Sequence, residues 1–297
     1  MKVFVTGAAG FIGSSIAAGL KAVGHDVTGL VRSEAQAAEL RKLDIEAIVG
    51  TLDDHDLLVA QAQASDGVIN AASSDHREAI ESLLEGLKGS NKPLLHTSGS
   101  SLVGENSKGE GTDHVFFEDT LPEPTPDKAA RVAIDNLVLG AASQQVRSAV
   151  LCNTLIYGHS IGLPRESVQL PRLIQQARKS GVMHHVGRGL NIWSNVHIQD
   201  VVDLYLLALE STPAGVFYFV ENGEASFRDM SNALARTLGM GEAQDWSIEA
   251  AIEEWGYEMA SYGLGSNSRV RGKRARNLLG WQPRQAAVLD WIGAEVR

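Results

Sequence analysis

Three glycines near the start of the chain have the spacing of a dinucleotide-binding turn. Gly7, Gly10 and Gly13 follow a short apolar run at residues 3–6 and open a helical pattern. The first glycine permits a tight turn, the second lets a pyrophosphate approach the backbone, and the third lets the helix pack closely on the strand. The helix N-terminus then offers free N–H groups and the positive end of its dipole to phosphates. The alternative is an ordinary strand-to-helix turn, but the position between a strand and a helix favours dinucleotide binding.

The end of the next expected strand, residues 25–33, predicts which dinucleotide binds. A site that prefers NAD places an acidic side chain about twenty residues beyond the glycines, where it binds the ribose 2′-hydroxyl. Val31 stands at that position here, and Arg32 and Ser33 follow it. Because a guanidinium can donate in pairs to phosphate oxygens, the pattern favours the 2′-phosphate of NADP(H). The alternative is that Arg32 is a solvated charge at a strand end.

The elements that hold these residues alternate regularly through the first half of the chain. Strands are expected at residues 3–6, 25–33, 45–50, 67–72, 93–98 and 146–153, separated by helices at 12–23, 34–43, 55–64, 76–89 and 127–144. The alternation predicts an α/β fold with a Rossmann-type, doubly wound parallel sheet. Ligands of such a sheet bind beyond the carboxyl ends of its strands. The cofactor-binding residues expected there are Gly7, Ala9, Gly10, Phe11, Ile12, Gly13, Arg32, Ser33, Thr51, Leu52, Asn70, Ala71 and Ala72.

The second half of the chain lacks this alternation. Residues 105–126 are polar and contain prolines, which predicts a loop over the site. Beyond residue 155 we expect helices at 168–179, 199–210 and 226–238 and a strand at 215–221. Residues 1–155 are therefore interpreted as an NADP(H)-binding domain. Residues 156–297 are interpreted mainly as a smaller substrate-binding lobe, with segments around 191–215 returning to the first domain.

Composition excludes several classes of protein. A net charge of −10 over 297 residues argues against general binding to nucleic acid or to an anionic membrane. Cys152 is the single cysteine, so no intrachain disulfide can form and a reducing compartment fits. No apolar run approaches the roughly 18 residues that span a bilayer, and the chain opens on a strand pattern rather than a signal, which together predict a cytoplasmic protein. No metal site is expected, because His184 and His185 would point apart on a strand and lack further ligands at suitable spacing.

Six stretches, in order, resemble the extended and atypical short-chain dehydrogenase/reductase families, which include the NAD-dependent epimerase/dehydratases. The matching stretches are TGAAGFIG (6–13), HTSGSSLVG (96–104), LIYG (155–158), NVHIQDVVDLYLLALE (195–210), FYFVENGEASFRDMSNALARTLG (217–239) and LGWQPR (279–284). The resemblance covers essentially the whole chain. It implies a Rossmann fold, a small C-terminal substrate lobe and NADP(H) as cofactor.

The catalytic residues of these families are missing. Their enzymes use Tyr-x-x-x-Lys at the start of the helix after the active-site loop, where the tyrosine transfers a proton to or from the substrate oxygen. Here Asp127 and Arg131 stand at those positions, with Asp135 at the usual place of a glutamate, and Gly99 replaces the expected serine. Asp127 is also explained as an acidic residue that stabilises a helix N-terminus. The candidates for catalysis are Ser98, Ser100, Asp127, Arg131 and Tyr157, and Arg131 is also a candidate to hold the cofactor ribose or a phosphate.

Three functions therefore remain open. The first is an NADP(H)-dependent oxidoreductase that transfers a hydride to or from a small carbonyl or alcohol, with the proton from Ser98, Ser100, Tyr157 or water. The second is a sugar epimerase or dehydratase, in which the same hydride step is transient. The third is a non-catalytic NADP(H)-binding regulator or interaction protein, which the missing dyad favours and the substrate lobe disfavours. The expected partner is a small-molecule substrate, and the expected assembly is a monomer or a homodimer.

Overall fold

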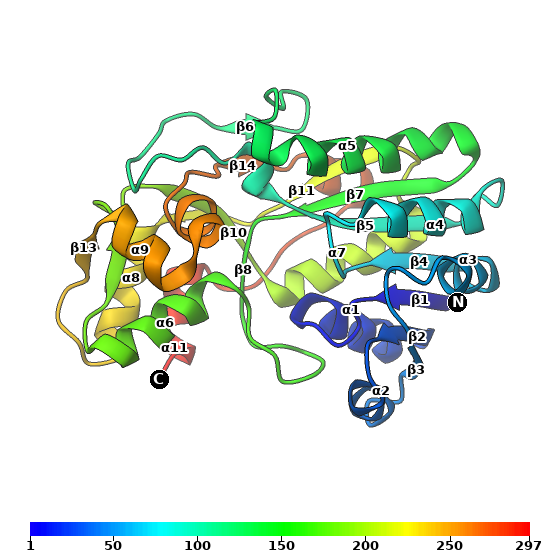
Figure 1. Ribbon diagram of the computed structural model, residues 1–297, viewed down its shortest axis with the longest axis horizontal. Helices are drawn as coiled ribbons and strands as arrows, with labels where there is room; N and C mark the ends of the chain where they lie inside the picture. Colours follow the sequence, from blue (N-terminus) through cyan, green and yellow to red (C-terminus); the bar gives the residue numbers. More distant parts are fainter.

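A seven-stranded parallel sheet forms the centre of the computed structural model, which describes residues 1–297 (Figure 1). The strand order is β11-β7-β5-β4-β1-β2-β3, and every neighbouring pair is parallel. The chain adds β2 and β3 on one side of β1 and β4, β5, β7 and β11 on the other, so the strand order switches between β1 and β4, as in a doubly wound fold. This confirms the predicted fold class. The strands are β1 (Lys2–Thr6), β2 (Asp26–Val31), β3 (Glu46–Val49), β4 (Gly67–Asn70), β5 (Pro93–Gly99), β7 (Arg147–Asn153) and β11 (Val216–Val220).

Helices cover both faces of this sheet and enclose two apolar cores. One face packs on α1 (Phe11–Ala22), α2 (Glu34–Arg41), α7 (Ile198–Ser211) and α10 (Arg274–Leu279). The other packs on α3 (His55–Ala64), α4 (Arg77–Leu87) and α5 (Pro126–Gly140). The central strands are apolar on both faces because both are buried, as parallel strands require. Short 3-10 helices follow β5 (η1, Ser100–Val103) and α5 (η2, Ala141–Gln144).

A third apolar core lies beyond the carboxyl edge of the large sheet, at the left of Figure 1. A three-stranded sheet with the order β12-β10-β8 supports it, formed by β8 (Leu155–Tyr157), β10 (Ile192–His197) and β12 (Glu224–Ser226). Its helices are α6 (Gln169–Ser180), α8 (Phe227–Thr237), α9 (Ile248–Trp255) and α11 (Val288–Glu295), joined by a π-helical turn, η3 (Met259–Leu264). Two short strands, β9 (His184–Val186) and β13 (Gln244–Trp246), pair at its outer side.

The chain crosses between these two parts more than once. After β10 it returns through α7, which packs on α1, and then adds β11 to the large sheet beside β7. The stretch predicted as a loop, 105–126, contains one short strand, β6 (Phe116–Phe117), which pairs with β14 (Val270–Arg271). The division near residue 155 into a cofactor domain and a substrate lobe stays a prediction.

Candidate functional site

The glycine turn is closed as tightly as its sequence predicts. Gly7 has a positive φ of +68°, and a Cβ on it would lie 2.5 Å from the Ala71 carbonyl oxygen. A Cβ on Gly13 would lie 2.1 Å from the Gly7 carbonyl oxygen, so only glycine lets α1 begin this close to β1. Gly10 is the N-cap of α1, and no side chain caps that end and no acidic residue stands in its first turn. The helix end is therefore open to an anion.

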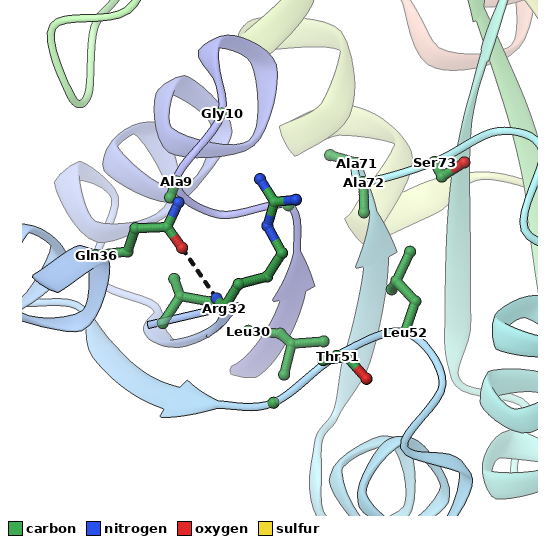
Figure 2. A pocket seen from close by; sticks show the side chains of 13 residues that line it. Ala9, Gly10, Leu30, Arg32, Gln36, Thr51, Leu52, Ala71, Ala72 and Ser73 are labelled. Carbon is green, nitrogen blue, oxygen red and sulfur yellow. Dashed lines mark hydrogen bonds between the residues drawn. The ribbon is translucent and has the colours of Figure 1, made fainter. Parts of the chain in front are cut away.

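A pocket of about 380 Å³ opens beside this turn, at the carboxyl ends of β1, β2 and β4 (Figure 2). The Arg32 side chain extends into it from the end of β2, while the Arg32 backbone N–H donates to Gln36 Oε1 at 2.9 Å. Ser33 has a different contact: its hydroxyl caps α2 by accepting from the Gln36 N–H at 3.3 Å. The residues that line the pocket are Gly7, Ala9, Gly10, Leu30, Val31, Arg32, Gln36, Gly50, Thr51, Leu52, Ala71, Ala72 and Ser73.

Most of the residues expected to bind the cofactor thus meet at one pocket. Phe11, Ile12 and Gly13 form the first turn of α1 beside it, and Asn70 lies buried beneath it. Sequence reasoning missed Gln36 and Ser73. Gln36 could have been found because it stands one turn into α2, three residues after a capping serine. The polar groups and the uncapped helix end fit a dinucleotide.

A chain of buried polar side chains runs under the pocket and ends at Ser98. Asn70 accepts from the Thr6 hydroxyl and contacts His96 Nδ1 through its amide nitrogen at 3.0 Å. On the other side of the ring, His96 Nε2 lies 3.5 Å from Asp135 Oδ1. Ser98 Oγ donates to Asp135 Oδ2 at 2.8 Å and is buried. The Ser98 hydroxyl is therefore directed into the protein toward Asp135.

Ser100 and Tyr157 also have internal partners. Ser100 is fully buried, and its hydroxyl and carbonyl oxygens both accept from Ser268 Oγ at 2.8 Å. Tyr157 donates to the Ala286 carbonyl at 2.6 Å and packs against Trp291. Burial raises the pKa of the Tyr157 hydroxyl above its ordinary range. The structure does not bring either hydroxyl to the pocket, because each closes a contact between distant segments.

Arg131 lies on α5 and spans the ends of two strands. Its guanidinium donates twice to the Asp75 carboxylate, at 2.8 and 2.6 Å, and once to Ser101 Oγ at 3.0 Å. The Arg131 guanidinium lowers the pKa of the Asp75 carboxyl below its usual value. His76, next to Asp75, is the N-cap of α4, and its ring accepts from the Ala79 N–H. The atom nearest to a Cβ placed on Gly99 would be Arg131 Nη1, at 3.9 Å.

Asp127 stands one helical turn before Arg131 and is exposed. Its carboxylate accepts a hydrogen bond of 2.7 Å from the hydroxyl of Tyr262, which belongs to η3. Sequence reasoning did not find Tyr262, since 135 residues separate the two partners. Arg131 thus lies near Gly99, and Asp127 stands one helical turn away from it on α5.

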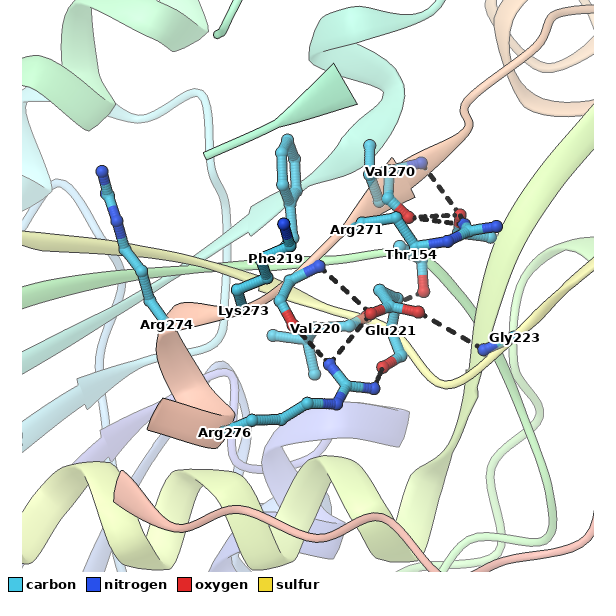
Figure 3. A network of polar contacts seen from close by, with 12 residues as sticks. Thr154, Phe219, Val220, Glu221, Gly223, Val270, Arg271, Lys273, Arg274 and Arg276 are labelled. Carbon is cyan, nitrogen blue, oxygen red and sulfur yellow. Dashed lines mark hydrogen bonds and ion pairs between the residues drawn. The ribbon is translucent and has the colours of Figure 1, made fainter. Parts of the chain in front are cut away.

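Three arginines that follow η3, Arg269, Arg271 and Arg276, are held by carboxylates. Glu224 pairs with Arg269 at 2.7 Å and with Arg271 at 2.9 Å. Burial alone would raise the pKa of the Glu224 carboxyl, but the hydrogen bonds from the two guanidiniums lower it overall. Figure 3 shows the neighbouring contact, in which Arg276 Nη1 donates to Glu221 Oε1 at 2.9 Å and Arg276 Nη2 to the Glu221 carbonyl. These guanidiniums are neutralised within the protein.

The chemistry that the site can support follows from these groups. The pocket offers an uncapped helix end and one guanidinium without a carboxylate partner, Arg32. No group of three or more His, Cys, Asp or Glu side chains is arranged to hold a metal ion. None of the helices has the length and apolar character needed to cross a membrane.

Comparisons with known proteins agree with this architecture. Residues 3–218 match the model of the NAD dependent epimerase/dehydratase family. An oxidase of an Acremonium species is 32% identical over 95% of this chain and 92% of its own. A 3-diazoavenalumate denitrifying reductase of a Streptomyces species is 25% identical over 99% of this chain and 100% of its own.

The same fold occurs in solved structures. A UDP-glucuronic acid 4-epimerase from Bacillus cereus, in complex with UDP-glucuronic acid and NAD, superimposes with a TM-score of 0.78, covering 99% of this chain and 98% of that one, at 21% identity. The family model and the 32% identical relative together decide the assignment. The chain belongs to the NAD dependent epimerase/dehydratase family.

Proposed function

We propose that this protein is an NADP(H)-dependent oxidoreductase that transfers a hydride between the cofactor and a small carbonyl or alcohol substrate, in the cytoplasm. The observation that carries the proposal is the Arg32 side chain in the pocket beside the glycine turn, at a strand end that lacks a carboxylate. A 2′-phosphate supplies the anion that Arg32 lacks in the protein. The reductase and the oxidase among the relatives support redox chemistry for the family.

We assign the proposed cofactor-binding residues to separate parts of the dinucleotide. The open end of α1, with Ala9, Gly10, Phe11, Ile12 and Gly13, receives the pyrophosphate. Arg32, with Ser33 and Gln36 behind it, receives the 2′-phosphate, and Thr51 and Leu52 border the same end. Ala71 and Ala72 are small, which leaves room for the cofactor to cross the end of β4 toward Ser73. The bound cofactor supplies the hydride, and the protein supplies orientation and a proton route.

Binding and turnover together test this proposal. We expect NADPH fluorescence to increase on binding, and NADH to bind at least tenfold more weakly. Arg32→Ala should remove most of that difference, since the lost contact is specific to the 2′-phosphate. Arg77→Ala is the matched control, because Arg77 pairs with Glu81 on the surface of α4 away from the pocket. Equal affinity of the native protein for NADPH and NADH would overturn the cofactor assignment.

Epimerisation or dehydration of a nucleotide sugar is the second candidate, supported by the family and by the Bacillus cereus epimerase. A diphosphate substrate requires cations that are free to pair with it. Glu224 occupies both Arg269 and Arg271, and Glu221 occupies Arg276, which argues for a substrate without phosphate. Calorimetric titration with UDP-glucose separates the two candidates: we expect no binding. Micromolar binding would instead favour the sugar nucleotide.

A non-catalytic NADP(H)-binding role is the third candidate, and the inward-facing hydroxyls of Ser98, Ser100 and Tyr157 favour it. Oxidation of NADPH in the presence of aldehydes and ketones distinguishes it from the first. Turnover of any of these carbonyls excludes a purely regulatory role. NADPH binding with no turnover across a broad panel would favour it.

A further inference from the structure

A tyrosine from outside α5 contacts the first turn of this helix. Tyr262 reaches it from η3, and its hydroxyl donates to Asp127 Oδ2 at 2.7 Å. The Lys128 ammonium lies 4.4 Å from the centroid of the Tyr262 ring, and Glu258 pairs with that ammonium. Tyr262 and Lys128 are both buried, with 7% and 2% of their surface exposed. A buried lysine and a buried phenol are thus fixed together, and the phenol donates to Asp127.

This cluster is connected to the cofactor pocket through α5 and Arg131. Asp127 and Arg131 are four residues apart and share one face of α5. Arg131 in turn contacts Asp75 and Ser101, which follow the carboxyl ends of β4 and β5. Ser73, two residues before Asp75, lines the pocket. The phenol is therefore linked through α5 and Arg131 to the residues that follow β4 and β5, and ligands of such a sheet bind beyond these strand ends.

The three hydroxyls predicted as proton sources have partners elsewhere in the protein. Ser98 and Ser100 are buried and bonded to Asp135 and Ser268, and Tyr157 is bonded to the Ala286 carbonyl. Asp127, in contrast, is exposed, so the proton of the Tyr262 hydroxyl lies next to a group in contact with water. Unlike these three hydroxyls, that of Tyr262 combines a fixed position with a path for its proton to exchange with solvent.

We propose that Tyr262 is the catalytic proton donor of the reductase, with Asp127 and Lys128 as positioning residues. The inference rests on the proposed function. The cofactor supplies the hydride and is oxidised. As the carbonyl carbon gains a C–H bond, the π pair of the C=O group moves onto oxygen, and that oxygen takes the proton of Tyr262 Oη. Solvent water beside Asp127 returns a proton to the tyrosinate. The reverse sequence oxidises an alcohol.

The electrostatics define how the donor behaves with pH. Asp127 accepts from the hydroxyl and raises the pKa of the Tyr262 phenol above its ordinary value, and burial and the neighbouring Tyr257 phenol add to this shift. The phenol consequently stays protonated throughout the neutral range. It remains a competent donor, because an alkoxide formed from a ketone is more basic than a tyrosinate. In the pH profile of kcat for reduction, ionisation of Tyr262 should then cause no loss of activity below about pH 10.

The first experiment compares two Tyr→Phe variants in the full chain. With NADPH and 4-nitrobenzaldehyde or 9,10-phenanthrenequinone as probes, we expect Tyr262→Phe to lower kcat by about 10²–10⁴-fold, as for a lost general acid, with NADPH affinity unchanged. Tyr218→Phe is the matched control, since it also loses one buried hydroxyl bond, to Thr212, but lies in β11 away from the cluster. Turnover of Tyr262→Phe within threefold of the native protein overturns the proposal.

The second experiment reads the phenol without turnover. Asp127→Asn removes the carboxylate that disfavours the tyrosinate, so the absorbance of ionised tyrosine near 295 nm should rise at lower pH than in the native protein. This rise in absorbance at lower pH should be absent from the double variant Asp127→Asn/Tyr262→Phe. In the single variant, an alkaline limb should appear in kcat for reduction over the same pH range. Identical titrations of the native protein and Asp127→Asn would remove Asp127 as a positioning residue.

The two proposals fail in different ways. If NADPH does not bind to the native protein, the proposed function is wrong. If NADPH binds and the probes are reduced equally well by native protein and Tyr262→Phe, the function stands and Tyr262 is not the donor. If NADPH binds but no carbonyl is reduced, both the redox function and the catalytic role of Tyr262 are overturned.

Discussion

Single residues at the site are held by charge pairs whose strength depends on pH. Arg131 donates twice to Asp75 and lowers the pKa of that carboxyl. A carboxyl whose folded pKa is lowered adds stability above its unfolded pKa, about 4, and loses it as the pH falls through the folded pKa. The Asp75 side chain is 56% exposed, so the pair should contribute only about 0.5–1 kcal/mol.

We therefore expect Asp75→Asn to lower the free energy of unfolding by that amount at pH 7. The gap to the native protein should close as the pH falls below about 4. Urea unfolding at pH 7, 5 and 3.5 measures it. Asp113→Asn is the control, because Asp113 is exposed and makes no hydrogen bond or ion pair. A gap that stays constant with pH would show that the carboxylate charge is not the cause.

Residues could be assigned from the sequence where the signal is local. Gly7, Gly10 and Gly13 stand within seven positions, and Arg32 follows a strand whose end is recognisable. The contact between Asp127 and Tyr262 has no such signal, because it joins two segments 135 residues apart through a turn of π-helix. The internal bonds of Ser98 and Tyr157 were equally hidden. Each depends on a partner that only the folded chain brings near.

At the scale of elements, the packing of α1 on β1 should be sensitive to a single methyl group. A Cβ on Gly13 would lie 2.1 Å from the Gly7 carbonyl oxygen, and that backbone atom cannot move without opening the turn. We expect Gly13→Ala to lower the free energy of unfolding by about 1–3 kcal/mol and to weaken NADPH binding. Chemical denaturation and NADPH fluorescence measure the two effects.

Gly140→Ala provides the matched comparison. Gly140 has a helical φ of −65° at the end of α5, and a Cβ there would meet nothing within 4 Å. The same substitution should raise the free energy of unfolding by about 0.4–1 kcal/mol, since alanine restricts the unfolded chain more than glycine does. Destabilisation at both positions would mean that close packing is not what makes Gly13 necessary.

Long helices and strands with a clear hydrophobic period were easier to predict from the sequence than short ones. The long helices α5 and α7 and the buried strands of the large sheet show clear patterns, and each was expected within a few residues of its observed bounds. Strands β6, β9, β12, β13 and β14 were not anticipated as a set. They are two or three residues long and pair across large sequence separations, so neither alternation nor a turn signal marks them.

At the scale of the whole molecule, the surface favours a monomer. Large exposed apolar side chains are scattered along the chain, and none lies on the two long helices α4 and α5. A stable interface needs an apolar centre, and a net charge of −10 adds repulsion between copies. We expect light scattering after size exclusion to give a mass near 31.8 kDa at micromolar concentration. A mass near twice that value would contradict this expectation and show that the protein is a homodimer.

The cofactor pocket also couples the two parts of the molecule. Arg165, in the segment after β8, donates to the Ala9 carbonyl at 3.2 Å and pairs with Glu39 of α2 at 2.6 Å. Leu163 donates its backbone N–H to Ser14 Oγ of α1. The glycine turn is therefore fastened to the chain beyond residue 155, and a ligand bound at the turn should stabilise both parts together.

We expect a single thermal transition whose midpoint rises when NADPH binds. At one hundred times its Kd, a ligand that binds only the folded state adds about 2.7 kcal/mol. For a chain of this size that corresponds to roughly 4 °C in Tm. At the same concentration, NADH should give a smaller shift, and in Arg32→Ala the two shifts should become similar. Differential scanning calorimetry measures them, and a second transition that NADPH leaves unmoved would show that the part beyond residue 155 unfolds independently of the cofactor pocket.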